Sequence, residues 1–377
     1  MLILFLISLA VLFYIFIGYP VVLAVLSGLF AKTVSRDDIT PEVSLIISAY
    51  NEQDVIREKL ENTLALDYPE EKLEVIVASE AADGTNDIVR QYAGRGVVLH
   101  AYENREGKSA TLWRTVPLTR GEILVFSDAN AMYHRDAIRK LVRNFADPRV
   151  GCVSGRLTYV NPGDSAVGQG ETAYWEFEFF LKAMLSRIMK LSGGVNGSIF
   201  AIRKSLYRPV DKTRGDDFEL SNRIQIAGHG VILEPEALSF EEASTTSRQE
   251  FRRKVRLATW NLQSTVILMR EALAAGELLT AFILFSHRFL RYTTPLWLLA
   301  LFVSNLFLLE GMLAWLFLLQ CLFYLMAVAG YVLEKRKRPV KTLFLIPFYF
   351  CMVNGAALLA LAKNLTSRTD VLWEKAR

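Results

Sequence analysis

The first 31 residues carry no charged side chain, and this feature restricts the class of protein more than any other. A helix needs roughly 20 apolar residues to cross a bilayer, so the run from Met1 to Ala31 is long enough to span one. It also exceeds the apolar core of a secretory signal, roughly 7 to 15 residues, and it has neither a basic start nor an A-x-A-like cleavage site. We therefore expect residues 1–31 to be a retained transmembrane anchor.

Three further uncharged runs lie near the C-terminus, and they predict more membrane helices. They are Tyr292–Leu309, Gly311–Leu333 and Thr342–Ala362, of which the first is the shortest. Hydrophobic residues make up 52% of the chain, above the roughly 45–50% of an ordinary soluble domain. We expect about three transmembrane or re-entrant helices within residues 292–363.

The basic segment Glu334–Lys341 between the last two runs predicts the orientation. Basic loops remain in the cytoplasm, so the middle of the chain, two spans earlier, is expected there too. Met1 then lies outside, and the membrane is expected to be the plasma (inner) membrane. Four full spans would export the basic residues after Ala362, whereas a re-entrant or interfacial last segment would retain them. Both alternatives stay open.

The chain accordingly divides into an anchor and a globular middle, followed by interfacial helices, membrane helices and a tail. The expected ranges are 1–31, 39–262, 263–291, 292–363 and 364–377. The three cysteines lack metal-ligand spacing, which argues against a zinc site or a disulfide framework. The net charge of +4 is slight, and the basic clusters flank membrane segments, which favours contact with membrane lipid over nucleic acid.

The middle region alternates strand-like and helix-like stretches. Strands are predicted at 43–48, 73–78, 97–101 and 123–127, and helices at 52–66, 86–92 and 108–116. This alternation predicts an α/β fold with a mostly parallel sheet covered on both faces. Ligands bind such sheets at the carboxyl ends of strands. The segments found there are Tyr50-Asn51-Glu52, Ser79-Glu80 and Ser127-Asp128-Ala129-Asn130.

Two acidic segments are candidates for chemistry. Asp128 and Asn130 present two oxygen-bearing side chains that can reach one hard cation bridging two phosphates. The alternative is an Asx-turn that ends a strand. Asp216 and Asp217 are adjacent carboxylates, which can supply a general base with a neighbour that raises its pKa. The alternative is a helix N-terminus that favours acidic residues, and the two interpretations are compatible.

Basic residues near the end of the middle region can bind a diphosphate. The cluster Arg252-Arg253-Lys254-Val255-Arg256 contains arginines, whose planar donors engage phosphate bidentately. Attraction to lipid headgroups is the competing explanation. Lys108 is a second possible phosphate contact or a solvated helix start. A P-loop is excluded because position 102, where that motif needs glycine, is Tyr102.

Taken in order, these segments resemble the family 2 glycosyltransferases over about residues 41–260. The matching segments are Ser48–Glu52, Val77–Thr85, Arg105–Lys108, Phe126–Asn130, Gly193–Arg203, Gly215–Asp217 and Arg253–Arg256. These enzymes invert the anomeric centre, adopt the GT-A fold, and include the membrane-embedded cellulose, chitin and hyaluronan synthases and ceramide glucosyltransferase-like proteins. The resemblance therefore implies a Rossmann-like GT-A domain with transmembrane helices at both ends.

The resemblance also implies roles for individual residues. Tyr50, Glu52, Glu80, Lys108, Asp128, Arg253 and Arg256 would bind the nucleotide-sugar, and Asp128 with Asn130 would hold a Mg or Mn ion. Asp217 would be the base beside Asp216. Asn196, Gly197 and Trp260 would line the acceptor site. Three positions depart from the family pattern: Glu80 and Asn130 stand where aspartates are usual, and Leu257 stands where polymerising members have tryptophan.

The expected function is transfer of a sugar, with inversion, from a nucleotide diphosphate-sugar to a lipid-linked or saccharide acceptor. A UDP-sugar is the expected donor. The absent Arg-Trp pair and the small number of spans favour a single transfer over the alternative, a processive polysaccharide synthase. A different class of function is a membrane-anchored, non-catalytic scaffold of a polysaccharide assembly complex, which the three departures would suit.

Overall fold

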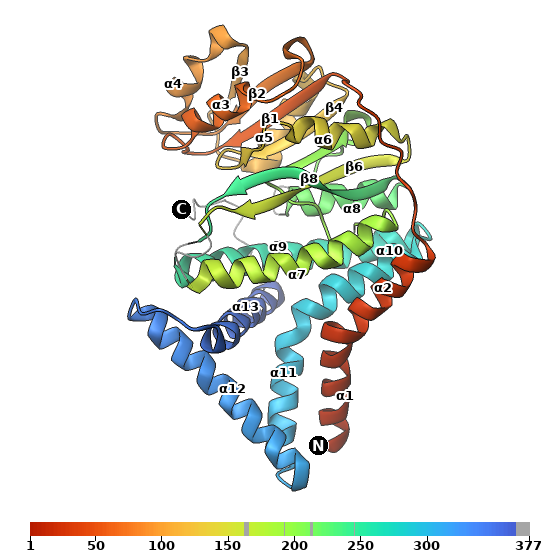
Figure 1. Ribbon diagram of the computed structural model, residues 1–377, viewed down its shortest axis with the longest axis vertical. Coiled ribbons are helices and arrows are strands. Elements are labelled where there is room, and N and C mark those ends of the chain that lie inside the picture. Colours follow the sequence, from red (N-terminus) through yellow and green to blue (C-terminus); the bar gives the residue numbers. More distant parts are fainter. Residues whose placement is uncertain (162–165, 192, 212–213, 245, 367–377) are drawn as a thin grey trace.

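The computed structural model describes residues 1–161, 166–191, 193–211, 214–244 and 246–366. A sheet flanked by helices forms one end of the molecule, and a layer of long helices lies directly beneath it (Figure 1). Further helices extend from this layer toward the end at which the N-terminus lies. The chain therefore combines an α/β part with a helical part, as the sequence predicts.

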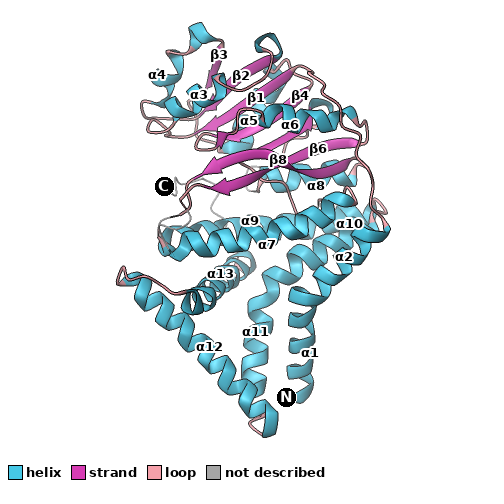
Figure 2. Cartoon of the chain, viewed as in Figure 1, coloured by secondary structure: helices cyan, strands magenta, loops and turns pink. Residues whose placement is uncertain are grey.

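One eight-stranded sheet, in the order β3-β2-β1-β4-β7-β6-β8-β5, organises the α/β part (Figure 2). β1 pairs in parallel with β2 and β4, β2 with β3, and β6 with β8. β7 runs antiparallel to β4 and β6, and β5 antiparallel to β8. The sheet is thus mixed but mostly parallel. The strands are β1 (Val43–Ala49), β2 (Leu73–Ser79), β3 (Val97–Ala101), β4 (Ile123–Asp128), β5 (Met132–Tyr133), β6 (Val150–Tyr159), β7 (Ile199–Arg203) and β8 (Gly230–Glu241).

Helices bury both faces of this sheet. Successive side chains of a strand point to opposite faces, so Leu45 and Ile47 of β1 pack in one core cluster with α3, α4 and α6. Ile46 packs in a second cluster, on the other face, with α5, α7 and α8. The helices are α3 (Ile56–Leu64), α4 (Thr85–Arg90), α5 (Lys108–Thr115), α6 (Ala137–Val142), α7 (Ala166–Arg187) and α8 (Asp216–Ile226).

The order of the strands positions the site. β2 and β3 follow β1 outward on one side, whereas β4 lies on its other side. Such a reversal leaves a crevice at the carboxyl ends of the two strands that flank it, and ligands of open α/β sheets bind there. Asp128 ends β4, and Tyr50 follows β1 directly, so both residues border this crevice.

Among the residues that the structure describes, three helices are long and apolar enough to cross a membrane. They are Leu2–Leu29, which comprises α1 (Leu2–Phe13), a π-helical turn and α2 (Tyr19–Leu29), and then α12 (Gly311–Lys335) and α13 (Thr342–Leu365). The shortest predicted run, Tyr292–Leu309, corresponds to α11 (Leu290–Leu306), which has 17 residues.

α11 is the end of a longer helical segment. It continues without a break from α10 (Leu278–Ile283) and a π-helical stretch, Leu284–Phe289, to form what we call helix 278–306. α11 packs against α1. The Tyr14 hydroxyl lies 2.8 Å from the Ser286 hydroxyl, which joins the N-terminal helix to helix 278–306.

α13 lies across the underside of α7 and α9 (Ser247–Ala274) (Figure 1). Its Tyr349 hydroxyl donates to Glu250 of α9 over 3.5 Å, and its Asn364 side chain donates to the Thr259 carbonyl over 3.2 Å. α9 runs through the boundary expected at residue 262, so the α/β part and the helical part share this helix. Residues 367–377, most of the expected tail, lie outside the described residues.

The end of α12 also contacts α9. Glu334 accepts a hydrogen bond from the Ser247 backbone N–H over 3.3 Å. Glu334 begins the basic segment Glu334–Lys341, so this segment starts beside the first residue of α9. The start of the basic segment and the start of α9 therefore lie side by side.

The packing of α13 on α7 predicts opposite effects for two glycine substitutions. A Cβ at Gly170 of α7 would lie 2.4 Å from the Tyr349 ring, whereas a Cβ at Gly355 of α13 meets its nearest neighbour at 3.7 Å. We expect Gly170→Ala to lower stability by about 1–3 kcal/mol through overpacking. We expect Gly355→Ala to leave stability unchanged or raise it by up to about 1 kcal/mol through helix propensity. Thermal unfolding of the purified protein in detergent measures both, and equal melting temperatures for the two variants would contradict this packing.

Candidate active site

A cavity of about 860 Å³ lies between the carboxyl ends of the sheet strands and the helices α7, α8, α9, α13 and 278–306. Every residue that the sequence nominates for the site lines this one cavity, although the residues are spread over more than 200 positions of the chain. They are Tyr50, Glu52, Glu80, Lys108, Asp128, Asn130, Asn196, Gly197, Asp216, Asp217, Arg253, Arg256 and Trp260.

The loops after β1 and β2 support each other at one end of the cavity. Asn51 adopts a left-handed backbone conformation, φ +54°, and its side chain accepts the Ala82 N–H over 2.9 Å. The Glu52 N–H donates to the Thr85 hydroxyl over 2.8 Å. These bonds fix the backbone after Tyr50, and β1 fixes the backbone before it, so Tyr50 is held at the cavity wall.

Glu80 organises the loop that precedes α5. Its carboxylate accepts the backbone N–H groups of Glu106, at 3.2 Å, and Gly107, at 2.8 Å, and pairs with Arg114 at 2.8 Å. The same loop carries Arg105, whose guanidinium lies 4.0 Å from the centre of the Tyr50 ring. A planar cation over an aromatic face suits a ligand that stacks, such as a nucleotide base. Glu80 thus shapes the cavity by holding this loop in place. From the sequence, Glu80 was noted only as a replacement of the usual aspartate, and this role was not predicted.

Lys108 joins the two acidic segments. Its ammonium lies 2.8 Å from the Asp128 carboxylate and 3.7 Å from the Asp216 carboxylate. Gly107 precedes it with φ +94°, a conformation that favours glycine and that starts α5 at Lys108. Burial alone would lower the pKa of Lys108, but the two carboxylates outweigh it and hold that pKa above its ordinary value. Lys108 is therefore a fixed positive charge between β4 and α8.

The turn after β4 is held in place by Lys59, a buried lysine of α3. Its ammonium donates to the Ala131 carbonyl and lies 3.9 Å from the centre of the Tyr133 ring. The Tyr133 hydroxyl in turn contacts the carbonyls of Phe126, at 3.1 Å, and Ser198, at 2.9 Å. Burial lowers the pKa of Lys59 to about 7. These contacts tie the Asp128 loop to the start of β7.

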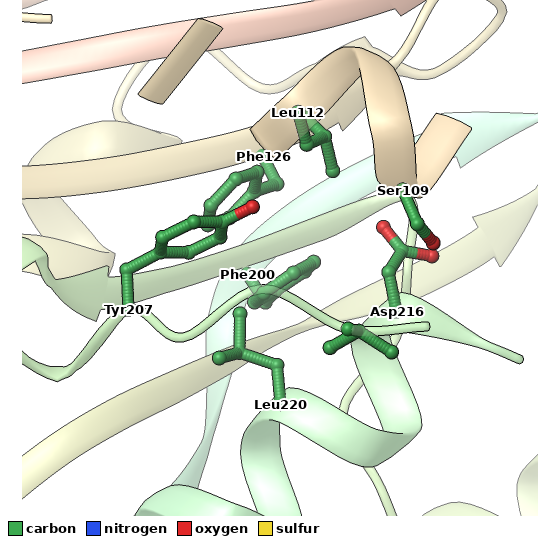
Figure 3. A pocket seen from close by; sticks show the side chains of 8 residues that line it. Ser109, Leu112, Phe126, Phe200, Tyr207, Asp216 and Leu220 are labelled. Atoms are coloured by element: carbon green, nitrogen blue, oxygen red, sulfur yellow. The ribbon is translucent and has the colours of Figure 1, made fainter. Parts of the chain in front are cut away.

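A small pocket of about 10 Å³ lies behind Asp216 (Figure 3). There the Asp216 side chain faces Ser109 at the start of α5, and the remaining labelled side chains are apolar or aromatic. Phe126 and Phe200 stack with their ring centres 4.8 Å apart. This packing of β4 on β7 forms a firm wall behind the acidic pair.

Asp217 is the carboxylate best suited to accept a proton. Burial, and next the adjacent Asp216, raise the pKa of Asp217 to about 6. A Cβ at Gly197 would lie 2.8 Å from the Asp217 carboxylate, so this glycine allows the acceptor segment to pass directly beside it. Asp217 also accepts the Phe218 N–H over 2.8 Å at the start of α8. The acidic pair starts a helix and also lines the cavity, so the two sequence interpretations remain compatible, and the role of Asp217 as base stays a prediction.

Asn196 places a hydrogen-bond donor near this base. Its side-chain oxygen accepts from Ser198, whereas its buried side-chain nitrogen has no partner among the described residues. A buried donor without a partner costs free energy, which a ligand hydroxyl would recover. This observation supports the predicted place of Asn196 in the acceptor site.

The two arginines of α9 differ in their surroundings. Arg253 is enclosed by carboxylates and forms ion pairs with Glu171 and Glu250, both of which are fully buried. Arg256, nearly one turn further on, lies with its guanidinium 5.5 Å from the centre of the Trp260 ring. Both arginines line the cavity, so both are candidates to meet a diphosphate.

The donor set suits Mg²⁺ or Mn²⁺. In the described part of the chain, no three His, Cys, Asp or Glu side chains converge on one point. Mg²⁺ is usually held by one or two protein carboxylates together with substrate phosphates. Asp128, with its carboxylate 39% exposed at the cavity, and the oxygen of Asn130 fit that pattern.

Sequence reasoning missed a group of side chains on the helical side of the cavity. Trp175, Glu178 and Lys182 come from α7, and Arg288 and Arg291 come from helix 278–306. More than 100 residues separate the two helices in the chain, so no local motif connects them. The only sequence signal was the spacing of the charged residues within each helix. Glu178 and Lys182 are four positions apart, and Arg288 and Arg291 are three apart, so each pair lies on one face of its helix.

Comparison with solved structures supports the fold over almost the whole chain. The mannosyltransferase PcManGT from Pyrobaculum calidifontis, solved in complex with GDP-Man and Mn2+, has a TM-score of 0.72 to this chain and 22% sequence identity. The similarity covers 97% of this chain and 99% of that one. At this level of identity the similarity shows a shared fold, helical part included.

Curated relatives match the middle of the chain. The probable glycosyltransferase YdaM of Bacillus subtilis (strain 168) is 27% identical over 235 residues, 59% of this chain and 55% of its own length. The beta-monoglucosyldiacylglycerol synthase of Synechocystis sp. is 29% identical over 222 residues, 55% of this chain and 45% of its own. The poly-beta-1,6-N-acetyl-D-glucosamine synthase of Staphylococcus aureus (strain MSSA476) is 25% identical over 240 residues, 61% of this chain and 56% of its own.

This chain therefore spans about half the length of the curated relatives it matches. The family profile described as "Glycosyltransferase like family 2" matches residues 41–259, which is more than half of the chain. The matched range contains the whole sheet and every side chain nominated for the site except Trp260, which follows it by one residue. The chain belongs to glycosyltransferase family 2.

Proposed function

We propose that this protein is a membrane-bound glycosyltransferase that transfers one sugar, with inversion, from a nucleotide diphosphate-sugar to a lipid or lipid-linked acceptor. The observation that carries the proposal is the position of Asp217. It combines a raised pKa with contact to the acceptor segment at Gly197, and it faces the same cavity as Asp128 and Lys108. A base on one side of the reacting carbon and cations on the other suit a single displacement.

In this mechanism the nucleotide lies between the loops after β1 and β2, beside Tyr50 and Arg105. Asp217 removes the proton from the acceptor hydroxyl, which then attacks the anomeric carbon of the donor. Lys108 and Arg256 stabilise the negative charge that develops on the departing diphosphate. A Mg²⁺ or Mn²⁺ ion bound by Asp128 and Asn130 would supply further neutralisation of that diphosphate.

The Mn2+ in the PcManGT structure supports a divalent cation for this fold. The GDP-Man of the same structure and the UDP-sugar that we expect here differ in the base, so donor identity rests on experiment. We propose a UDP-sugar, on the resemblance of the motifs.

Single transfer remains the favoured alternative to polymerisation. Leu257 stands where the resemblance places the tryptophan of polymerising members, and Trp260 lies beside Arg256 instead. A processive polysaccharide synthase is the second candidate, and the length of the product separates the two. A non-catalytic scaffold has less support, because Lys108, Asp128, Asp216 and Asp217 surround one cavity in an arrangement that suits catalysis.

We also propose that the protein is integral to the plasma (inner) membrane with its α/β part in the cytoplasm. Leu2–Leu29, α11 and α12 would cross the bilayer, and α13 would lie at its cytoplasmic surface. The packing of α13 across α7 and α9 supports this arrangement. This arrangement would keep the basic residues after Ala362 in the cytoplasm, and it corresponds to the interfacial alternative that the charge pattern left open.

Replacement of Asp217 tests the proposed base. Asp217→Asn keeps the shape and removes the proton acceptor, so transfer should fall by about 10²- to 10⁴-fold. Donor binding, measured as thermal stabilisation by UDP- and GDP-sugars with and without Mn²⁺, should persist. Asp87→Asn on the exposed surface of α4 serves as the control and should transfer normally. Full turnover by Asp217→Asn would remove Asp217 from this role.

The pH dependence of transfer follows from the same side chain. A general base must be ionised, and the pKa of Asp217 is raised to about 6. We therefore expect kcat/KM to fall by about tenfold per pH unit as pH decreases below about 6, and to level off above it. Initial rates between pH 5 and 8 measure this profile. Rates that are constant down to pH 5 would contradict the assignment, and the residual rate of Asp217→Asn should lack this dependence.

A further inference from the structure

A second group of charged side chains faces the cavity, away from Asp128 and Lys108. Glu178 and Lys182 lie one turn apart on α7, and His287, Arg288 and Arg291 lie on helix 278–306. The proposed mechanism uses none of them. The Arg291 guanidinium lies 5.7 Å from the centre of the Tyr174 ring, which packs in one cluster with Val353 of α13, so this group lies beside an element that we place at the membrane.

Most of these side chains have a partner within the group. Arg291 forms an ion pair with the Glu178 carboxylate, and the His287 ring nitrogen Nε2 lies 3.3 Å from the same carboxylate. Arg288 donates to the Gly193 carbonyl, and its guanidinium lies 5.3 Å from the centre of the Phe218 ring. Arg288 therefore lies beside the residue that follows Asp217.

Lys182 is the exception. Its side chain is 2% exposed, yet in the part of the chain that the structure describes it forms neither a hydrogen bond nor an ion pair. Its ammonium lies 5.3 Å from the centre of the Trp175 ring. Burial, and next the charge of Arg288, lower the pKa of Lys182 to about 8. A buried ammonium without a partner is costly unless an anion approaches it.

The side chains of this group carry a net positive charge, which favours binding of an anion. Lys182, Arg288 and Arg291 are three cations, and Glu178 is the one carboxylate paired with them. Glu178 pairs with Arg291, and Asp217 is a further acidic neighbour of Lys182, so three cations face two carboxylates and one positive charge is left to be matched. Asp217 is also an acidic neighbour of Lys108, so the proposed base is close to the donor cations and to this group.

We propose that Lys182 and Arg288 form a subsite for the phosphate of the acceptor, and hence that the acceptor is a lipid with a phosphate-bearing headgroup. This inference rests on the proposed function, because it names the acceptor class of that site. The phosphate lies beside Asp217, so that the acceptor hydroxyl reaches the base. The apolar part of the acceptor extends toward α11 and α13, the elements that we place at the membrane. A neutral diacylglycerol or an uncharged saccharide would leave Lys182 without a partner.

The test measures binding, so it does not depend on turnover. The purified full-length protein in detergent is titrated with two matched pairs of short lipids: farnesyl phosphate against farnesol, and dihexanoyl phosphatidic acid against dihexanoylglycerol. Inorganic phosphate forms a separate arm. We expect the wild-type protein to bind at least one phosphorylated lipid about tenfold or more tightly than its neutral counterpart, because the phosphate would form charge-assisted contacts with Lys182 and Arg288. Inorganic phosphate alone should bind much more weakly.

Lys182→Met keeps the length of the side chain and removes its charge. It should abolish the preference for the phosphorylated lipid, and, without ligand, its melting temperature should equal or exceed that of the wild type. A lysine with a merely structural role would give a lower melting temperature. Lys190→Gln is the control, because Lys190 follows α7, pairs with Glu277 and lies outside the cavity lining. It should retain the preference.

Stabilisation by UDP- and GDP-sugars with Mn²⁺ is measured in parallel and reports on the proposed function separately. Donor binding that survives in Lys182→Met, together with loss of the lipid preference, supports the subsite. Equal binding of phosphorylated and neutral lipids by the wild type would overturn it even if donor binding is normal. Loss of donor binding in Lys182→Met would also overturn it, because Lys182 would then belong to the donor site. Inorganic phosphate that binds as tightly as the lipids would overturn the lipid headgroup as its source.

Discussion

The pairing of Lys108 with Asp128 and Asp216 is the interaction on which the site depends. Three carboxylates, from the end of β4 and the start of α8, face one partly buried cavity, where their mutual repulsion would otherwise separate these elements. One ammonium at 2.8 Å and 3.7 Å from two of them keeps them close. For the third carboxylate, Asp217, burial and next the adjacent Asp216 raise the pKa to about 6. Structural and catalytic roles are thus divided among neighbouring acids.

The helical part completes the site as well as anchoring it. α9 follows the last strand of the sheet in the chain. It places Arg256 at the cavity and packs against α13. The network of Arg253 with Glu171 and Glu250 joins α7 to α9, and Tyr349 adds α13 to it. Because these helices form the wall opposite the sheet, the side of the cavity that we propose for the acceptor is built from elements that we place at the membrane.

The sequence predicted the parallel half of the sheet and the segments at its carboxyl ends, since short apolar runs between helix-like stretches report burial directly. It did not predict that Glu80 holds the loop before α5, because that contact depends on two backbone N–H groups 26 and 27 residues away. Lys182 was missed for a related reason. A lysine in a helix indicates solvent exposure, whereas this one is buried beside Trp175 and lines the cavity together with residues of helix 278–306.

The central claim is that the sugar is transferred in a single displacement, with Asp217 as the base and no covalent intermediate. The anomeric configuration of the product tests this claim most directly. With an α-linked nucleotide-sugar donor, the proton NMR spectrum of the product after one turnover should show the β-configured linkage. A product that keeps the α configuration of the donor would contradict the account.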